Sequence, residues 1–145
     1  MQIYADNAAT TKMSRTAIDA MLPYMETYFG NPSSLHTIGQ QAAEALQKAR
    51  ETVAECLGCQ PREITFTSGG SEADNQALVS AARIGERKGK KHIISTAFEH
   101  HAILHTCQWL ETQGWQVTYL PVDADGFVTV QQVENAMRVV AALSR

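Results

Sequence analysis

The sequence predicts an α/β fold in which a mostly parallel sheet lies between layers of helices. Residues 64–67, 92–96 and 116–120 are typical of strands, and amphipathic helical stretches separate them. An alternation of strand, helix and strand is typical of parallel strands joined by right-handed crossovers. Because parallel strands are normally covered on both faces, we expect three layers. A sheet of three strands has two open edges, so we expect the chain to be a truncated part of a larger domain.

Two amphipathic helices are predicted ahead of the first strand. Residues 16–29 and residues 38–57 each repeat apolar side chains at helical spacing. The run from Gly30 to Ser34 breaks the chain between them, and Gly58 suits the end of the second helix. Their apolar faces consist of Ile18, Met21, Leu22, Met25 and Phe29, and of Ile38, Ala42, Ala45, Ala49, Val53 and Leu57.

Three further helices are predicted between and after the strands. The first begins at Ser71, because Ser71 and Asp74 resemble a capping box. The second covers residues 101–112 and ends at Gly114, and the third follows a turn at residues 123–126. Their buried faces are predicted to be Ala77, Leu78, Ala81 and Ile84; Ile103, Leu104, Cys107 and Leu110; and Val133, Ala136, Met137 and Val140.

Composition excludes several classes of partner. The chain has 145 residues, a net charge of -3 and 44% hydrophobic residues, as in a globular protein of one domain. The basic cluster at residues 87–91 is interpreted as a solvated loop, because the chain as a whole is acidic, so we expect no nucleic-acid partner. No apolar run approaches the roughly 20 residues of a membrane span, and the first residues do not form a secretory signal. We therefore expect a cytoplasmic protein.

Cysteine and histidine spacing predicts no metal site. Cys56 and Cys59 form a single C-x-x-C without a second ligand pair, so ordinary packing is favoured over a zinc site or a redox pair. His101 and His105 are four residues apart, which is a metal-ligand spacing on a helix. No third ligand accompanies them, and no H-E-x-x-H motif is present.

A glycine turn and a histidine follow two of the predicted strands. Ser68 to Ser71 follow the strand ending at Thr67, and glycines at a helix start suit a phosphate, although most such turns are only connections. His100 follows the strand ending at Thr96, where an imidazole either contacts a planar ligand and moves protons or simply caps a helix. Ligands bind at the carboxyl ends of parallel strands, so we expect Ser71 and His100 to face one cleft.

Five segments together resemble the NifS/IscS-like cysteine desulfurases, which are pyridoxal-phosphate enzymes of the class V aminotransferase group. The resemblance covers residues 3 to about 137. It depends on the order and spacing of the five segments, because each segment alone is modest evidence for a family. The segments are YADNAATT at residues 4–11, GNPSS at 30–34 with His36 and Gly39, ITFTSGGSEADN at 64–75, EHHA at 99–102, and YLPVD at 119–123 with Asp125 and Gly126.

The resemblance implies a role for each matched segment. Gly70 and Ser71 resemble the anchor for the phosphate of the pyridoxal 5'-phosphate cofactor, and His100 resembles the catalytic histidine that stacks on the pyridine ring. Asn7, Ala8 and Thr10 belong to a segment, residues 1–13, that in the family packs with the small domain near the substrate. Residues 14–145 resemble the first half of the cofactor-binding large domain. The family takes sulfur from L-cysteine, forms homodimers and passes sulfur to an acceptor or scaffold protein for iron–sulfur cluster assembly.

The resemblance stops before the lysine that holds the cofactor and the cysteine that carries the sulfur. The residues Lys12, Lys48, Lys88, Lys90, Lys91, Cys56, Cys59 and Cys107 match neither motif. The resemblance therefore implies that these 145 residues alone are inactive, and the ending at residues 137–145 departs from the family pattern. Two alternatives remain open: another class V enzyme, such as a selenocysteine lyase or an aminotransferase, and a non-catalytic remnant or interaction module.

Overall fold

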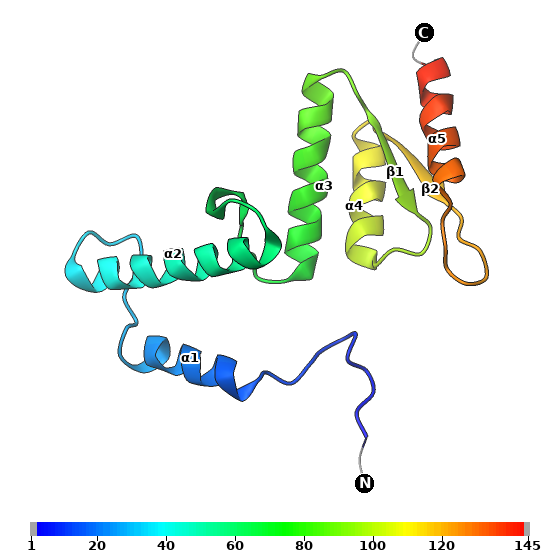
Figure 1. Ribbon diagram of the computed structural model, residues 1–145. Helices are drawn as coiled ribbons and strands as arrows, with labels where there is room; N and C mark the ends of the chain where they lie inside the picture. Colours follow the sequence, from blue (N-terminus) through cyan, green and yellow to red (C-terminus); the bar gives the residue numbers. More distant parts are fainter. Residues whose placement is uncertain (1–2, 144–145) are drawn as a thin grey trace. The chain divides into compact units, whose positions relative to one another are not determined.

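A computed structural model describes residues 3–143, with side chains as far as residue 137. The chain divides into two compact units, residues 1–65 and residues 66–145, and each is described by itself. Figure 1 shows the helices and strands of both units. The predicted boundary between residues 13 and 14 stays a prediction.

Helices form the first unit. It contains α1 (Arg15–Glu26), α2 (Thr37–Leu57) and the short 3-10 helix η1 (Pro61–Glu63). Ser14 begins α1 by accepting a hydrogen bond from the Ala17 N–H (3.1 Å), as an N-cap residue should. The predicted end of α2 is confirmed, because Gly58 adopts a left-handed φ of 66° there.

The loop between α1 and α2 depends on two glycines that lie close to other backbone atoms. A Cβ atom at Gly30 would collide with the carbonyl of Ile38, and one at Gly39 would collide with the carbonyl of Ser34. Asn31 folds the loop by accepting the Ser33 N–H on its side chain (2.9 Å). The predicted break after α1 is therefore a compact turn packed against the start of α2.

The second unit contains the sheet. Its elements are α3 (Gly70–Arg87), β1 (His92–Thr96), α4 (His101–Thr112), β2 (Gln116–Leu120) and α5 (Val130–Leu143). β1 and β2 are parallel, with His92 opposite Gln116 and Thr96 opposite Leu120. α4 contacts β2, α5 contacts both strands, and Figure 1 shows the strands between these two helices. The predicted parallel α/β architecture with flanking helices is thus confirmed.

The strand predicted at residues 64–67 is wrong. The described residues form one sheet of two strands, β1 and β2, and residues 64–67 pair with neither. Ile64 has the extended backbone that its side chain favours, at φ -89° and ψ 126°. Strand propensity describes a residue that fits a pleated surface, and a strand also needs a neighbour to pair with. The turn at residues 68–71 therefore follows an extended segment rather than a sheet strand.

The core of the second unit lies where α3 and α4 meet the sheet. Ala82, Leu110 and Trp115 are buried together, and Ile93 packs against them. The predicted inward face of α4 is confirmed, since Cys107 and Leu110 are buried and its other two members are half-buried.

The predicted face of α3 is wrong for three of its four residues. Ala77, Ala81 and Ile84 are exposed, Leu78 is half-buried, and Ala82 is the buried residue of this helix. α3 carries two adjacent apolar rows, and α4 covers the row that contains Ala82. Periodicity alone does not distinguish two such rows.

His92 makes the second unit sensitive to pH. Its imidazole Nε2 lies 2.7 Å from the Thr118 hydroxyl, which joins β1 to β2. Burial lowers the pKa of His92 from the ordinary 6.5, so the folded state favours the neutral ring. The unfolded chain therefore binds the proton at higher pH. The contribution of His92 is complete above pH 6.5 and is lost as the pH falls below it.

We predict that a His92→Gln variant, which keeps a polar side chain but does not titrate, shows a smaller loss of stability between pH 7.5 and pH 5.5. Urea denaturation of both proteins at the two pH values measures this difference. Equal losses in the variant and the wild-type chain would contradict the assignment to His92.

Candidate functional site

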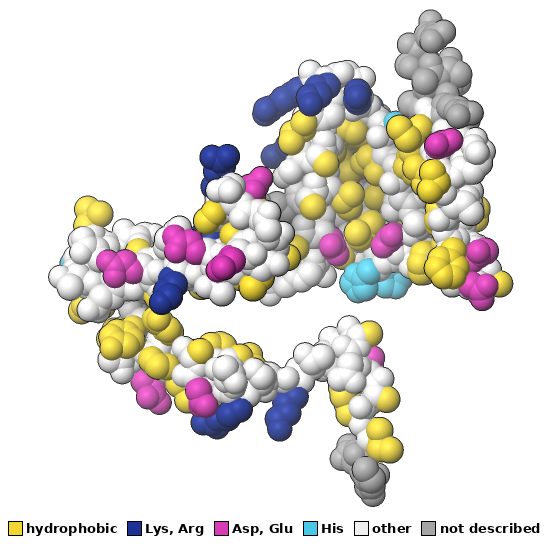
Figure 2. All heavy atoms as spheres, viewed as in Figure 1, with side chains coloured by type: hydrophobic (Ala, Val, Ile, Leu, Met, Phe, Trp, Pro, Cys, Tyr) yellow, Lys and Arg dark blue, Asp and Glu magenta, His cyan; other side chains and the backbone are white. Residues whose placement is uncertain are grey.

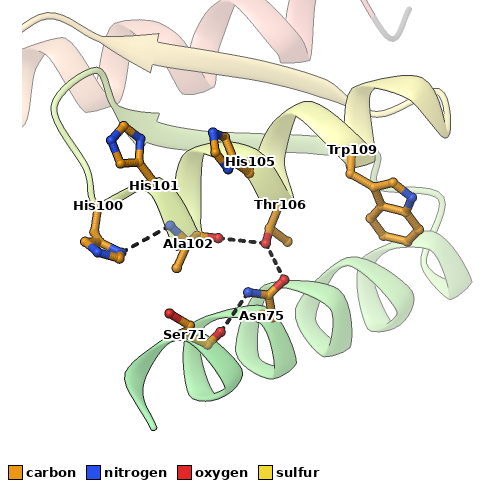
Figure 3. Close-up of a pocket in the computed structure, with 8 residues that line it drawn as sticks. All are labelled: Ser71, Asn75, His100, His101, Ala102, His105, Thr106 and Trp109. Carbon is orange, nitrogen blue, oxygen red and sulfur yellow. Dashed lines mark hydrogen bonds between the residues drawn. The ribbon is translucent and has the colours of Figure 1, made fainter.

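A hollow of about 400 Å³ lies on the surface of the second unit, between the starts of α3 and α4. We call it the α3–α4 hollow. Figure 3 shows its lining, and Figure 2 shows histidine side chains gathered at the lower edge of this unit. The structure thus brings the predicted pair Ser71 and His100 to one hollow. The lining residues are Ser71 and Asn75 from α3 and His100, His101, Ala102, His105, Thr106 and Trp109 from α4 and its cap.

The start of α3 has the character of an anion site. Gly69 is the N-cap residue, and no side chain caps the helix. A Cβ atom at Gly69 or Gly70 would meet no other atom within 4 Å, so the backbone is open to an approaching group. The first N–H groups of a helix have no partner within the helix, and they carry a partial positive charge. The N–H groups at Gly70 and Ser71 therefore suit the oxygens of a phosphate.

The predicted capping box of Ser71 and Asp74 is wrong. α3 begins one residue earlier than predicted, at Gly70, so Ser71 lies inside its first turn. Glu72 reaches back instead, and its Oε2 accepts hydrogen bonds from both the N–H and the hydroxyl of Ser68 (2.7 Å each). The side-chain and then the backbone hydrogen bond of Ser68 lower the pKa of Glu72. The loop before α3 is thus fixed by a carboxylate that remains charged at neutral pH.

His100 occupies the N-cap position of α4. Its Nδ1 accepts a hydrogen bond from the Ala102 N–H at 3.1 Å. A ring nitrogen that accepts carries no proton, so this hydrogen bond assigns the proton of the neutral ring to Nε2. The ring is exposed, and its centroid lies 6.1 Å from that of His101. The interpretation of His100 as a helix cap is confirmed, and its contact with a planar ligand stays a prediction.

Two polar residues that sequence reasoning missed connect the starts of α3 and α4. Asn75 Nδ2 donates to the Ser71 carbonyl (2.7 Å), and the Thr106 hydroxyl donates to Asn75 Oδ1 (2.6 Å). The same hydroxyl lies 2.7 Å from the Ala102 carbonyl. Figure 3 shows these contacts as one chain that ends at His100. The signal was available, because Thr106 is a polar residue in the apolar row formed by Ile103, Cys107 and Leu110.

Asn7, Ala8 and Thr10 lie in the first unit. They belong to a turn in which the Asp6 carbonyl accepts the N–H groups of Ala9 (3.1 Å) and Thr10 (3.4 Å). The α3–α4 hollow belongs to the second unit, and its lining contains none of these residues. Their predicted place beside the substrate stays a prediction.

The cysteines differ in accessibility. Cys56 is exposed, Cys59 is half-buried, Cys107 is fully buried, and all three are free thiols. Burial raises the pKa of Cys107, and the negative charges of Glu111 and Glu99 raise it further. Cys107 is therefore a core residue with little thiolate character.

The described part of the chain holds neither a cluster of metal ligands nor a helix that could span a membrane. Within it, no three or more His, Cys, Asp or Glu side chains are grouped so that they could hold a metal ion. The helices of the same residues include none that combines the length and apolar character needed to cross a membrane.

The chain resembles proteins of one family along nearly its whole length. Residues 3–143 match the aminotransferase class-V family. Cysteine desulfurase IscS of Methanosarcina thermophila is 51% identical over 136 residues, which cover 94% of this chain and 33% of that protein. The chain thus spans about a third of the length of the curated relatives it matches.

Two solved structures resemble the chain in both sequence and fold. A "NifS-like protein" is 39% identical with a TM-score of 0.87, over 93% of this chain and 37% of that one. "SspA in complex with cysteine" is 40% identical with a TM-score of 0.85, over 92% of this chain and 38% of that one.

The Glu72 contacts predict a local pH response at the start of α3. Because the folded pKa of Glu72 is lowered below 4.5, its hydrogen bonds with Ser68 are complete above pH 4.5 and are lost as the pH falls further. We expect the Ser68 amide proton to shift in NMR spectra with a midpoint below pH 4.5, and we expect Glu72→Gln to abolish that shift. A midpoint at or above 4.5, or an unchanged titration in Glu72→Gln, would contradict the contact.

Proposed function

This chain belongs to the aminotransferase class-V family, and on that premise we propose that it supplies the phosphate-binding and ring-binding residues of a pyridoxal-phosphate-dependent cysteine desulfurase. The reaction converts L-cysteine and an enzyme thiol to L-alanine and an enzyme persulfide. The observation that carries the proposal is the meeting of Ser71 and His100 at one hollow, beside a glycine helix start without a side-chain cap.

The residues of the hollow fit the cofactor in two respects. The N–H groups of Gly70 and Ser71 and the Ser71 hydroxyl match the donors that a phosphate requires. The exposed His100 ring suits contact with a pyridine ring. No lysine is among the residues that line the hollow. The hollow therefore contributes binding and orientation of the cofactor rather than its covalent attachment. When bound, pyridoxal 5'-phosphate supplies the electron sink for the reaction.

His100 has a defined part in the proposed chemistry. Its Nδ1 is engaged by the Ala102 N–H, so Nε2 is the nitrogen that gives a proton to the substrate or takes one back. The same hydrogen bond fixes the plane of the ring. An imidazole is suited to this work because it changes charge near neutral pH.

The substrate and partners are also part of the proposal. L-cysteine as the substrate agrees with the similarity to SspA, whose structure contains cysteine. Asn7, Ala8 and Thr10, within the segment 1–13, are proposed to approach that substrate, and residues 14–145 are proposed to form the first half of the large domain. We propose a homodimer in the cytoplasm that passes sulfur to an acceptor or scaffold protein for iron–sulfur cluster assembly. None of the three cysteines is assigned the role of sulfur carrier, and Cys107 is unsuited to it because it is buried.

We predict that the gene product, isolated from its own source, makes alanine and persulfide from L-cysteine. In that protein, His100→Asn is expected to lower kcat by about 100-fold, because it removes a proton-transferring group. Asn is also a good N-cap residue, so the melting temperature is expected to change little. Alanine release by mass spectrometry and a thermal melt measure the two quantities.

Thr112→Val is the control, because Thr112 is exposed at the far end of α4 and its hydroxyl bonds only with Trp109 and the adjacent Gln113. It is expected to keep the wild-type kcat. Two results would refute the proposal: no alanine from the wild-type protein, or full activity in His100→Asn. Activity on selenocysteine alone would favour a selenocysteine lyase instead.

A further inference from the structure

We infer that Asn75 and Thr106 are positioning residues that hold the phosphate site at Ser71 and the ring site at His100 at a fixed separation. This inference rests on the proposed function, because it assumes one ligand that occupies both sites. Neither residue needs to touch that ligand for the inference to hold. Figure 3 shows Asn75 and Thr106 farther along α3 and α4 than Ser71 and His100, with a hydrogen bond between them.

The hydrogen bonds form a continuous path. From Ser71 the path passes through its carbonyl to the Asn75 amide (2.7 Å) and on to the Thr106 hydroxyl (2.6 Å). From Thr106 it continues to the Ala102 carbonyl (2.7 Å), and the Ala102 N–H bonds to His100 (3.1 Å). The Asn75–Thr106 contact is the step that crosses from α3 to α4. Loss of the Asn75–Thr106 hydrogen bond would leave each helix start intact but would no longer hold the two starts at a fixed distance from each other.

Burial gives this contact its strength. Thr106 is 5% exposed, and it is the buried polar residue of α4. A hydrogen bond in such a low-dielectric place is stronger than one in water, so Thr106 favours arrangements in which Asn75 is within reach. Asn75 itself is exposed, so its amide can bond to water when the contact is lost. The Thr106 hydroxyl keeps the Ala102 carbonyl as its partner when the contact is lost, so the loss unlinks the two helix starts without leaving an unpaired buried polar group.

The hydrophobic contacts do not replace this role. The α3–α4 core is formed by Ala82, Leu110 and Trp115, and Ala82 lies about two turns beyond Asn75 along α3. Apolar burial is non-directional, so it holds the helices together without fixing their starts to a fraction of an ångström. A short hydrogen bond beside the hollow adds the direction that apolar packing lacks.

A fixed separation has a consequence that a purely structural role does not share. A ligand with both a phosphate and a ring gains affinity when its two sites are held at the right distance beforehand. A ligand that occupies only one site gains nothing from the separation. Loss of the Asn75–Thr106 contact should therefore weaken the binding of the larger ligand selectively.

The test compares two probes on the 145-residue chain by NMR titration, with the Ser71 amide and the His100 ring as reporters. Pyridoxine 5'-phosphate carries the phosphate and the ring but lacks the aldehyde that would react with lysines, and inorganic phosphate carries the anion alone. The variants are Thr106→Val, which keeps the shape of the side chain, and Asn75→Ala, which changes an exposed residue. Thr106→Ser keeps the hydroxyl, and Thr112→Val removes a threonine hydroxyl that does not cross between helices.

We expect Thr106→Val and Asn75→Ala to weaken the binding of pyridoxine 5'-phosphate about three- to tenfold, because both variants lose the hydrogen bond that joins α3 to α4. Their affinity for inorganic phosphate should change by less than about twofold. Thr106→Ser and Thr112→Val should behave as the wild-type chain does. Unchanged binding of pyridoxine 5'-phosphate in the first two variants, or equal losses for both probes, would overturn the inference. A wild-type chain that binds neither probe at Ser71 would instead refute the proposed function on which the inference rests.

Discussion

Thr106 places a hydroxyl group inside the apolar contact between α3 and α4, and the geometry of the candidate site depends on how that group is satisfied. The side chain is 5% exposed, and its partners are Asn75 on α3 and the carbonyl of Ala102 on its own helix. The Ala102 carbonyl belongs to the same helix as Thr106, so the buried hydrogen bond to Asn75 is the one that restricts where α3 can lie on α4. The restriction acts at the ends of the helices that carry Ser71 and His100. Farther from these helix starts, the packing of α3 against α4 is apolar and centres on Leu110 and Trp115.

The two helix starts that form the hollow begin in different ways, and each way suits its proposed ligand group. α4 begins with His100, whose Nδ1 caps the helix while the rest of the ring remains exposed. α3 begins with Gly69, which offers no side chain, so its first N–H groups are available to an anion. Glu72 reinforces the loop before α3 by binding Ser68 and leaves the glycine backbone open. Side chains cap α1 and α2 instead, where Ser14 and His36 accept from the helix backbone.

Sequence reasoning predicted the elements whose signals are local. The bounds of β1, α4 and β2 follow from β-branched runs, from apolar spacing and from Gly114, whose φ of 85° suits glycine. Sequence reasoning failed where the structure of a segment, or the face that it buries, depends on a distant partner. Residues 64–67 have strand-like side chains but pair with neither strand, and α3 has two apolar rows of which α4 covers the less obvious one.

In the candidate site too, local signals were predicted and a contact with a distant partner was missed. Ser71 and His100 were predicted to share a cleft, and both line the α3–α4 hollow, although Ser71 reaches it through the packing of α3 rather than from a strand end. Asn75 and Thr106 were missed because their roles arise from a contact across 31 positions of sequence. A polar residue in the apolar row of α4 was the local clue, but the sequence does not say which residue satisfies it.

The central claim is that one phosphorylated aromatic ligand spans Ser71 and His100. A crystal structure of the chain with pyridoxine 5'-phosphate tests it most directly. The account predicts the phosphate on the backbone N–H groups of Gly70 and Ser71, the ring against His100, and the Asn75–Thr106 hydrogen bond intact beneath the ligand. A phosphate bound away from the start of α3, or a ring that does not touch His100, would contradict the account.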